Sequence, residues 1–249
     1  MGLDGRVVAI TGAARGLGRS YASLFAADGA TVVVTDVDGP GAERAAKEIE
    51  ADGGRALAVE VDVTDEASTT AMAETVAAAV GPIGVLINNA GIWGDLKREP
   101  LASMDVGYWD FVMAVNVKGP LLCSRAVLPG MVDAGWGRIV NISSMGAYMS
   151  AGVYGVSKLA LNQLTFALAT EVGDCGVTVN AVAPGTIANE ATLRQVPPAG
   201  MEKMVNAAVI KRAGTADDLY GMLRYLTSDD AAWVTGQTFM VNGGFSTRF

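Results

Sequence analysis

Short runs of β-branched and aliphatic residues alternate along this chain with longer stretches rich in alanine and leucine. Seven such runs are predicted to be strands: Val7–Thr11, Thr31–Thr35, Leu57–Val61, Val85–Asn88, Arg138–Ile142, Val177–Ala181 and Thr238–Val241. Six helices are predicted between them: Gly16–Asp28, Gly41–Ala51, Glu66–Val80, Tyr108–Ala134, Val153–Val172 and Ala216–Ser228. Nearly unbroken apolar strands are typical of sheets that are covered on both faces. The alternation predicts an α/β fold: one doubly wound, Rossmann-type domain whose seven-stranded, mostly parallel sheet carries helices on both faces.

Residues 1–249 are predicted to form a single domain, because no composition break, linker or internal repeat divides the chain. The stretch from Pro184 to Ala207 is predicted to be a long irregular loop, and it contains two consecutive prolines, Pro197 and Pro198. Long loops inside compact domains usually either carry function or are disordered. Because this one follows a strand end, residues around 186–207 are predicted to form a lid over a ligand.

Charge and residue types exclude several classes of function. The formal net charge is −8 without any run of Lys or Arg, so nucleic acid and anionic membranes are not expected partners. The chain has no histidine, which excludes Ser-His-Asp and Cys-His catalysis and His-ligated zinc. No metal site is expected. Proton transfer near neutral pH must therefore use Tyr, Lys, Cys or a carboxylate.

The N-terminal residues show no secretory signal, and no apolar run approaches the ~20 residues of a membrane-spanning helix. Two cysteines far apart in the sequence, Cys123 and Cys175, are expected to be free thiols. These features together predict a cytoplasmic protein.

A glycine-rich segment joins the first predicted strand to the first predicted helix. Gly12, Gly16 and Gly18 allow the backbone to turn tightly and approach a pyrophosphate, which the helix N-terminus also attracts. The alternative is an ordinary glycine-rich turn. Asp36 ends the second strand about 20 residues further on, where the dinucleotide rule requires an acidic residue for the ribose. The combination favours a dinucleotide site.

Two further strand ends carry polar residues with two interpretations each. Asp62 is placed either to hydrogen-bond an adenine amine or to cap the turn from Thr64 to Glu66, and the sequence does not choose between them. The segment 88–91 (Asn-Asn-Ala-Gly) suits a crevice where a ligand lies against the backbone, but a plain Asx turn is the alternative.

Tyr154 and Lys158 stand one helical turn apart and are predicted to share a face. A nearby ammonium stabilises a phenolate and lowers the pKa of a tyrosine from its usual ~10, which yields a general acid–base without histidine. An exposed tyrosine over a lysine stem is the alternative. Ser143 and Ser144 follow a strand that ends on the same side of the sheet, where a hydroxyl is able to bind a substrate oxygen.

From residue 7 to residue 245, these motifs resemble in order and spacing the single-domain branch of the short-chain dehydrogenase/reductase family. The matching pieces are Thr11–Gly18, Asp62, Asn88–Gly91, Asn116, Ser144, Tyr154 with Lys158, Pro184-Gly185, and 235–237 before Gly243-Gly244. The resemblance implies that Tyr154 is the acid–base and that Lys158 lowers its pKa and binds the nicotinamide ribose. It further implies that Ser144 orients the carbonyl and that Asn116 holds a proton-relay water.

The predicted cofactor site combines the glycine segment, the strand ends and the residues that the resemblance places beside the nicotinamide. It comprises Gly12, Arg15, Gly16, Leu17, Gly18, Asp36, Asp62, Val63, Asn89, Ala90, Gly91, Tyr154, Lys158, Pro184, Gly185 and Ile187.

The chain departs from the family pattern at two places. The segment between Ser144 and Tyr154 is short, which leaves Ser143 as the second candidate for the carbonyl-orienting serine, although strand register favours Ser144. Asn189 stands where the family commonly has threonine, so its amide is a candidate contact to the cofactor or a sign that the lid is set differently.

The expected activity is hydride transfer between NAD(H) and a bulky, uncharged ketone or secondary alcohol. Asp36 and Asp38 oppose the 2′-phosphate of NADP, while Arg15 would attract it, so NAD is predicted and NADP is less favoured. The expected pocket is apolar: Trp93, Met145, Tyr148, Met149, Val153, Thr186, Met201 and Met204. Lys97 and Arg98 would weaken that argument if their loop folded inward.

Two alternatives remain, an NADP-dependent 3-oxoacyl-carrier-protein reductase and a non-catalytic NAD sensor. The reductase would need a basic docking patch, and the sensor would be expected to lack Tyr154 or Lys158. The family resemblance also implies a homotetramer with the last helices and the C-terminal strand at its interfaces.

Overall fold

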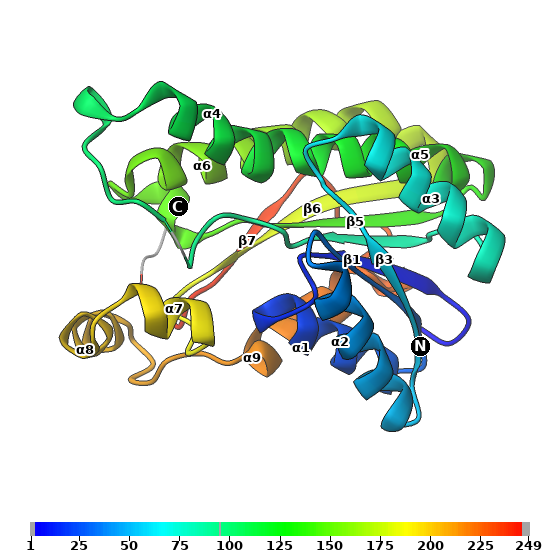
Figure 1. Ribbon diagram of the computed structural model, residues 1–249, viewed down its shortest axis with the longest axis horizontal. Coiled ribbons are helices and arrows are strands. Elements are labelled where there is room, and N and C mark those ends of the chain that lie inside the picture. Colours follow the sequence, from blue (N-terminus) through cyan, green and yellow to red (C-terminus); the bar gives the residue numbers. More distant parts are fainter. Residues whose placement is uncertain (1–2, 95, 246–249) are drawn as a thin grey trace.

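A seven-stranded parallel sheet forms the centre of the molecule, in the order β3-β2-β1-β4-β5-β6-β7 (Figure 1). The computed structural model describes residues 3–94 and 96–245. The strands are β1 Val7–Thr11, β2 Thr31–Asp36, β3 Arg55–Glu60, β4 Val85–Asn88, β5 Gly137–Ile142, β6 Val177–Pro184 and β7 Thr238–Val241. The doubly wound α/β fold predicted from the alternation is confirmed.

Helices cover both faces of the sheet (Figure 1). On one face lie α1 Gly16–Ala27, α2 Gly39–Ala51 and α9 Ala216–Leu226. On the other lie α3 Glu66–Val80, α5 Gly119–Asp133 and α6 Gly152–Val172. Consecutive residues of a strand point to opposite faces, so Val8 and Ile10 enter one core while Val7 and Ala9 enter the other. This double burial explains why the strands are apolar throughout.

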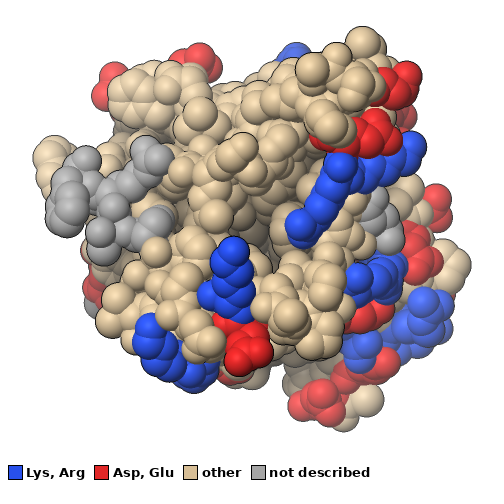
Figure 2. Space-filling view, turned by 90° about the vertical axis from the view of Figure 1, so that its left-hand side faces the viewer, with Lys and Arg blue, Asp and Glu red and all other residues tan. Residues whose placement is uncertain are grey.

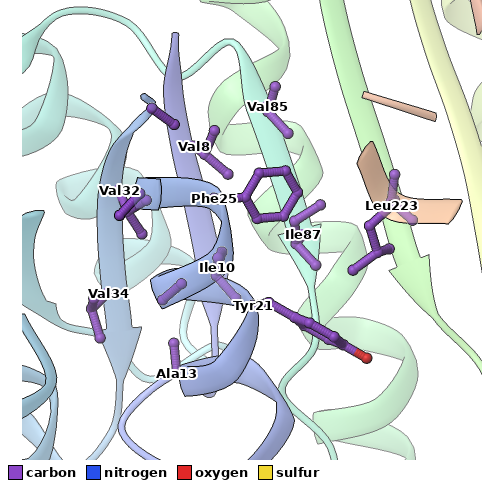
Figure 3. Close-up of a cluster of buried hydrophobic side chains, with 14 of the residues drawn as sticks. Val8, Ile10, Ala13, Tyr21, Phe25, Val32, Val34, Val85, Ile87 and Leu223 are labelled. Atoms are coloured by element: carbon purple, nitrogen blue, oxygen red, sulfur yellow. The ribbon is translucent and has the colours of Figure 1, made fainter. Parts of the chain in front are cut away.

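The core beneath α1 shows how closely helix and sheet pack. Tyr21 and Phe25 are fully buried, and in Figure 3 they lie over side chains of β1, β2 and β4. Truncation of a buried aromatic side chain typically costs about 3–5 kcal/mol of stability. This packing fixes α1, and with it the glycine segment that precedes the helix.

The predicted helix Tyr108–Ala134 is found at that place, but it is not one continuous α-helix. It consists of α4 Val106–Met113, a π-helical turn over Ala114–Lys118, and α5. The stretch Val106–Asp133 is long and apolar enough, by composition, to pass as a membrane span, but 44% of its apolar window is buried inside the domain. Within the domain, α3, α6 and the strands β4 and β5 contact α5.

The stretch predicted as an irregular loop contains two helices, α7 Glu190–Gln195 and α8 Pro198–Ala207. Asn189 caps α7 by accepting a hydrogen bond from the Thr192 amide at 2.8 Å, and Pro198 starts α8 at a position that proline tolerates. The prolines mark a helix start, and the prediction of an irregular loop was wrong for that reason.

Candidate active site

A cavity of about 580 Å³ lies at the carboxyl ends of the strands, where an open α/β sheet binds its ligands. It opens on the face shown in Figure 2, which is hollowed between its upper and lower parts and is mostly uncharged around the hollow. Of the residues predicted to bind the cofactor, all but Gly18 line this cavity: Gly12, Arg15, Gly16, Leu17, Asp36, Asp62, Val63, Asn89, Ala90, Gly91, Tyr154, Lys158, Pro184, Gly185 and Ile187.

Gly18 has a packing role instead. A Cβ atom at Gly18 would collide with the Gly12 carbonyl oxygen and the Asn89 side-chain amide. One at Gly12, whose φ is +64°, would lie 2.8 Å from the Ala90 Cα atom. Both glycines therefore allow the glycine segment to press against the residues that follow β4.

The Asn89 side chain holds the glycine segment from the other side. Its Nδ2 atom donates to the carbonyl oxygens of Thr11 at 2.9 Å and Gly12 at 3.0 Å, and the Thr11 hydroxyl accepts from the Asn89 amide. The N-cap residue of α1, Arg15, makes no side-chain capping bond, so the first turn of the helix has N–H groups available for an anion at the cavity wall. This segment fits a bound pyrophosphate.

Asp36 is fixed by backbone groups on both sides. Its Oδ2 accepts from the Ala14 amide and its Oδ1 from the Asp38 amide, each at 3.0 Å. Asp38 forms a long ion pair with Arg44 at 3.7 Å. Among the described residues, Asp36 has no ion-pair partner, and neither does Arg15 on the same wall of the cavity. The carboxylate is therefore placed to accept hydrogen bonds from ribose hydroxyls.

Asp62 forms the turn that was one of its two interpretations. Its Oδ1 accepts from both the amide and the hydroxyl of Thr64, at 2.8 and 2.7 Å, while Asp65 provides the N-terminal cap of α3. Asp62 also lines the cavity, so its position remains compatible with an adenine contact as well.

Tyr154 and Lys158 lie side by side on α6 and face the cavity. Both are buried, and the Lys158 Nζ atom is 5.8 Å from the centre of the Tyr154 ring. The same Nζ donates to the Ile142 carbonyl oxygen at 2.7 Å, which directs it toward the end of β5. The two residues are thus brought together as the helical spacing predicts.

Burial dominates the ionisation of this pair. It raises the pKa of Tyr154 to about 12, against which a hydrogen bond from Ser144 acts, and it lowers the pKa of Lys158 to about 8. The predicted lowering of the tyrosine pKa by Lys158 is not the leading effect in this structure. The Ser144 hydroxyl is the group that acts in favour of the phenolate here, and Lys158 Nζ lies 5.8 Å from the ring centre.

Of the two candidate serines, Ser144 faces the tyrosine. Its hydroxyl lowers the pKa of Tyr154 and accepts from the Gly146 amide at 3.0 Å. The Ser143 hydroxyl instead turns to the Lys158 carbonyl oxygen at 3.4 Å and is buried against α6. The geometry therefore favours Ser144 as the hydroxyl that contacts a substrate oxygen.

Asn116 sits in the π turn, and both ends of its amide are engaged. Its Oδ1 accepts from the Ile92 amide at 2.8 Å, and its Nδ2 donates to the Ser157 hydroxyl at 3.0 Å. Ser157 in turn donates to the Tyr154 carbonyl oxygen at 2.8 Å. A Cβ atom at Gly91 would meet both the Asn116 Oδ1 and the Lys158 Nζ. Asn116 therefore ties the segment after β4 to the helix that carries Tyr154, and its proton-relay role stays a prediction.

The segment after β6 completes the nicotinamide end. A Cβ atom at Gly185 would lie 2.5 Å from the Asn242 Cα atom, so glycine is needed where this segment crosses the end of β7. Asn189 uses its Oδ1 to cap α7, which accounts for the asparagine found where the family commonly has threonine.

The substrate end of the cavity differs in part from the expected pocket. Of the residues predicted to line it, five do so: Trp93, Met145, Met149, Thr186 and Met204. The remaining three, Tyr148, Val153 and Met201, do not. Tyr148 accepts a hydrogen bond from Asn162, and Val153 belongs to a separate cluster with Tyr108 and Val112.

Several lining residues were not predicted from the sequence, among them Phe111 on α4, Val115 in the π turn, and Glu190 with Arg194 on α7. Arg194 is paired with Glu190 at 2.6 Å. Lys97 lies over the Tyr108 ring, and neither it nor Arg98 lines the cavity. The substrate end is therefore mainly apolar and aromatic.

Comparison with known proteins places this site among oxidoreductases. A family model described as Enoyl-(Acyl carrier protein) reductase matches residues 12–246. An uncharacterized oxidoreductase of Mycobacterium tuberculosis is 44% identical over 97% of both chains. The 3-oxoacyl-[acyl-carrier-protein] reductase of Pseudomonas aeruginosa is 39% identical over 98% of each chain. The crystal structure of a putative short-chain alcohol dehydrogenase from Sinorhizobium meliloti superposes with a TM-score of 0.91 at 34% identity, covering 98% of this chain and 97% of that one.

Proposed function

The chain belongs to the short-chain dehydrogenase/reductase family, and from that premise we propose that it is an NAD-dependent oxidoreductase acting on a bulky, uncharged ketone or secondary alcohol. The single observation that carries the proposal is the arrangement of Tyr154, Ser144 and Lys158. All three face one cavity, whose other end is formed by a glycine segment that fits a dinucleotide.

The residues divide the chemistry between them. A bound nicotinamide supplies or accepts the hydride. Reduction then needs one proton at the carbonyl oxygen, and the Tyr154 hydroxyl is placed to donate it; oxidation of the alcohol returns the proton to the phenolate. Ser144 holds the substrate oxygen beside that hydroxyl, and the charge of Lys158 stabilises the phenolate.

The preference for NAD rests on charge at the far end of the cavity. The Asp36 carboxylate is held by two backbone amides and has no cationic partner among the described residues, so no neighbouring cation offsets its charge toward the ribose. A 2′-phosphate there would be repelled by this carboxylate, with Asp38 nearby. Arg15 is the cation whose attraction for the phosphate opposes this repulsion.

The apolar substrate end supports an uncharged substrate. Its walls include Trp93, Phe111, Met145, Met149 and Met204. Arg194, the basic residue on the α7 side, is paired with Glu190, which offsets its charge toward a carboxylate or phosphate.

The second candidate is a 3-oxoacyl-carrier-protein reductase, which the relative from Pseudomonas aeruginosa and the matching family model favour. An acidic carrier protein would have to dock on a chain with a formal net charge of −8. This charge balance supports a free small substrate. A non-catalytic NAD sensor is disfavoured because Tyr154, Lys158 and Ser144 are all present and brought together.

One assay separates these functions. Purified protein is mixed with NADH or NADPH and with aryl ketones, alicyclic ketones or a 3-oxoacyl thioester, and the reduced-cofactor absorbance is followed. Turnover of ketones with NADH supports the proposal. Turnover restricted to the thioester with NADPH replaces it with the second candidate, and cofactor binding without any turnover identifies a sensor.

We further propose a cytoplasmic homotetramer. Apolar side chains exposed on α6, at Val156, Leu159 and Phe166, support a helical interface. The edge strand β7 and the fully exposed Trp233 that precedes it support a second. Light scattering on the purified protein tests the assembly: a monomer at micromolar concentration contradicts it.

A further inference from the structure

Trp93 lies between the catalytic tyrosine and the lid segment. It follows β4 by five residues and lines the cavity. Its ring centre is 4.9 Å from that of Tyr154, with the two planes inclined at 43°. Aromatic rings at this separation attract each other and restrict each other's orientation. One face of the Tyr154 ring is therefore held by an indole.

The same indole reaches α7. Its Nε1 donates to the Thr192 hydroxyl, at a long distance of 3.4 Å. Thr192 is the buried residue of this short helix, and its amide also donates to the capping Oδ1 of Asn189. The contact with Trp93 is therefore made at the point where α7 is already fixed at its N-terminus.

Two more contacts join α7 to the segment that contains Trp93. The Gln195 side-chain amide donates to the Leu96 carbonyl oxygen at 2.7 Å. A Cβ atom at Gly94 would lie 3.1 Å from the Ala191 Cβ, so the segment passes close to the helix. Ala191, Thr192 and Gln195 belong to about one helical turn, and they lie against Gly94, Trp93 and Leu96 respectively. We call this set of contacts the clasp.

The outer surface of the lid is exposed. None of the α8 residues is buried, and Leu193 on α7 is 61% exposed. The clasp thus attaches α7 beside the substrate end of the cavity, where Ala191 and Thr192 line the wall together with Trp93.

We propose that Trp93 is a positioning residue that couples closure of the α7 lid to the orientation of Tyr154. The inference rests on the proposed function, since it concerns a substrate bound beside Tyr154. The indole has two separable tasks. Its ring positions the Tyr154 ring for proton transfer, and its N–H group holds α7 over the bound substrate.

The two tasks are separated by different substitutions. Trp93→Phe keeps an aromatic ring and loses the N–H group, and Thr192→Val removes the acceptor at similar size. Each is expected to raise KM about three- to tenfold with kcat little changed, the usual size of one lost hydrogen bond. Trp93→Leu removes the ring as well, so kcat is expected to fall about tenfold further while cofactor affinity is kept. Leu193→Ala, on the exposed side of α7, is the matched control and is expected to behave as the wild type.

A double variant tests the coupling directly. If the N–H group of Trp93 acts through Thr192, the Trp93→Phe/Thr192→Val enzyme is no worse than the poorer single variant. Additive losses overturn the coupling.

Hydrogen exchange supplies a readout that does not depend on turnover. The amides of Thr192, Leu193 and Val196 are bonded within the α7 segment. Their exchange, followed by mass spectrometry, is expected to quicken about three- to tenfold in both single variants and to stay unchanged in Leu193→Ala. If wild type turns over ketones but Trp93→Phe and Thr192→Val match the control in both measurements, the inference is wrong. If wild type turns over no substrate while exchange quickens as expected, the proposed function fails and the clasp stands.

Discussion

Neutralising Asp36 is expected to shift the enzyme from NAD toward NADP. Unit charges 4 Å apart interact by about 1 kcal/mol in water and about 4 kcal/mol at an effective dielectric constant of 20. Asp36 is half-buried at the cavity wall, between these limits. The repulsion of a 2′-phosphate is therefore about 2–3 kcal/mol, a factor of about 30 to 150 in the ratio of kcat/KM values for NAD and NADP.

Asp36→Asn is the appropriate change, because it removes the charge at constant shape. The carboxylate accepts from two amides, Ala14 N and Asp38 N, and an asparagine oxygen replaces one acceptor while its NH₂ group cannot replace the other. A loss of about two- to tenfold in kcat/KM for NAD is thus expected from a loosened glycine segment. The gain in kcat/KM for NADP should exceed this loss in kcat/KM for NAD.

The assay is kcat/KM for both cofactors on one alcohol, with cofactor affinities measured separately by calorimetry. Asp38→Asn is the control for long-range charge, since Asp38 caps α2 and is paired with Arg44. It should change the ratio by much less. Arg15→Ala added to Asp36→Asn should remove most of the new NADP activity. A wild-type preference for NADP, or an unchanged ratio in Asp36→Asn, refutes the reasoning.

Three further outcomes are expected. Tyr154→Phe should lower kcat by about 10²–10⁴ while the cofactor still binds in calorimetry, and a variant that keeps a tenth of the activity would show another proton donor. Ser144→Ala should reduce kcat about tenfold or more and Ser143→Ala much less, because the Ser144 hydroxyl acts on the Tyr154 hydroxyl while that of Ser143 turns to the Lys158 carbonyl oxygen; equal losses in parallel assays would contradict this assignment. Burial lowers the pKa of Lys158 to about 8, below its value in the unfolded chain, so the unfolded state binds more protons between pH 8 and 10.5 and stability contributed by this group rises across that window. In urea unfolding, this contribution to the free energy of unfolding should reach about 3 kcal/mol between pH 8 and 10.5 in the wild type and be missing in Lys158→Met. Identical pH profiles of the unfolding free energy for the two proteins would exclude this contribution.

The parts of the fold that were predictable are those whose side chains face a core. Strands β1, β4 and β7 and helix α3 have the predicted bounds, because an apolar run bounded by glycine or a polar cap leaves little choice of ends. Strand β6 runs three residues beyond its prediction, to Pro184, because Ala183 and Pro184 pair with Met240 and Val241 of β7. Such pairing is tertiary, and a single run does not reveal it.

The same distinction holds within the site. Helix α8 has no buried residue, and although Met201, Met204 and Val205 stand at helical spacing, the two prolines at its start suggested a loop. The grouping of Tyr154, Lys158 and Ser144 was predictable because it depends on helical spacing and on the end of one strand, and their catalytic roles stay predictions. Tyr148 was misplaced because it ends the short turn at 145–148, which Ser144 caps, and Val153 was misplaced because it packs against Tyr108 and Val112 on α4.

Because of the π turn at Ala114–Lys118, the geometry of the site depends on the number of residues in this helix as well as on their identity. A π turn holds one residue more than the α-helical turn it replaces, and each residue of a helix rotates its successor by about 100°. Loss of one residue here would restore a regular helix and turn Asn116 away from Ile92 and Ser157. This would happen even if every side chain that contacts a ligand were kept. Substitutions among small apolar residues in this turn leave the register intact. Over evolutionary time, this helix is therefore expected to tolerate changes of residue here far better than changes of length.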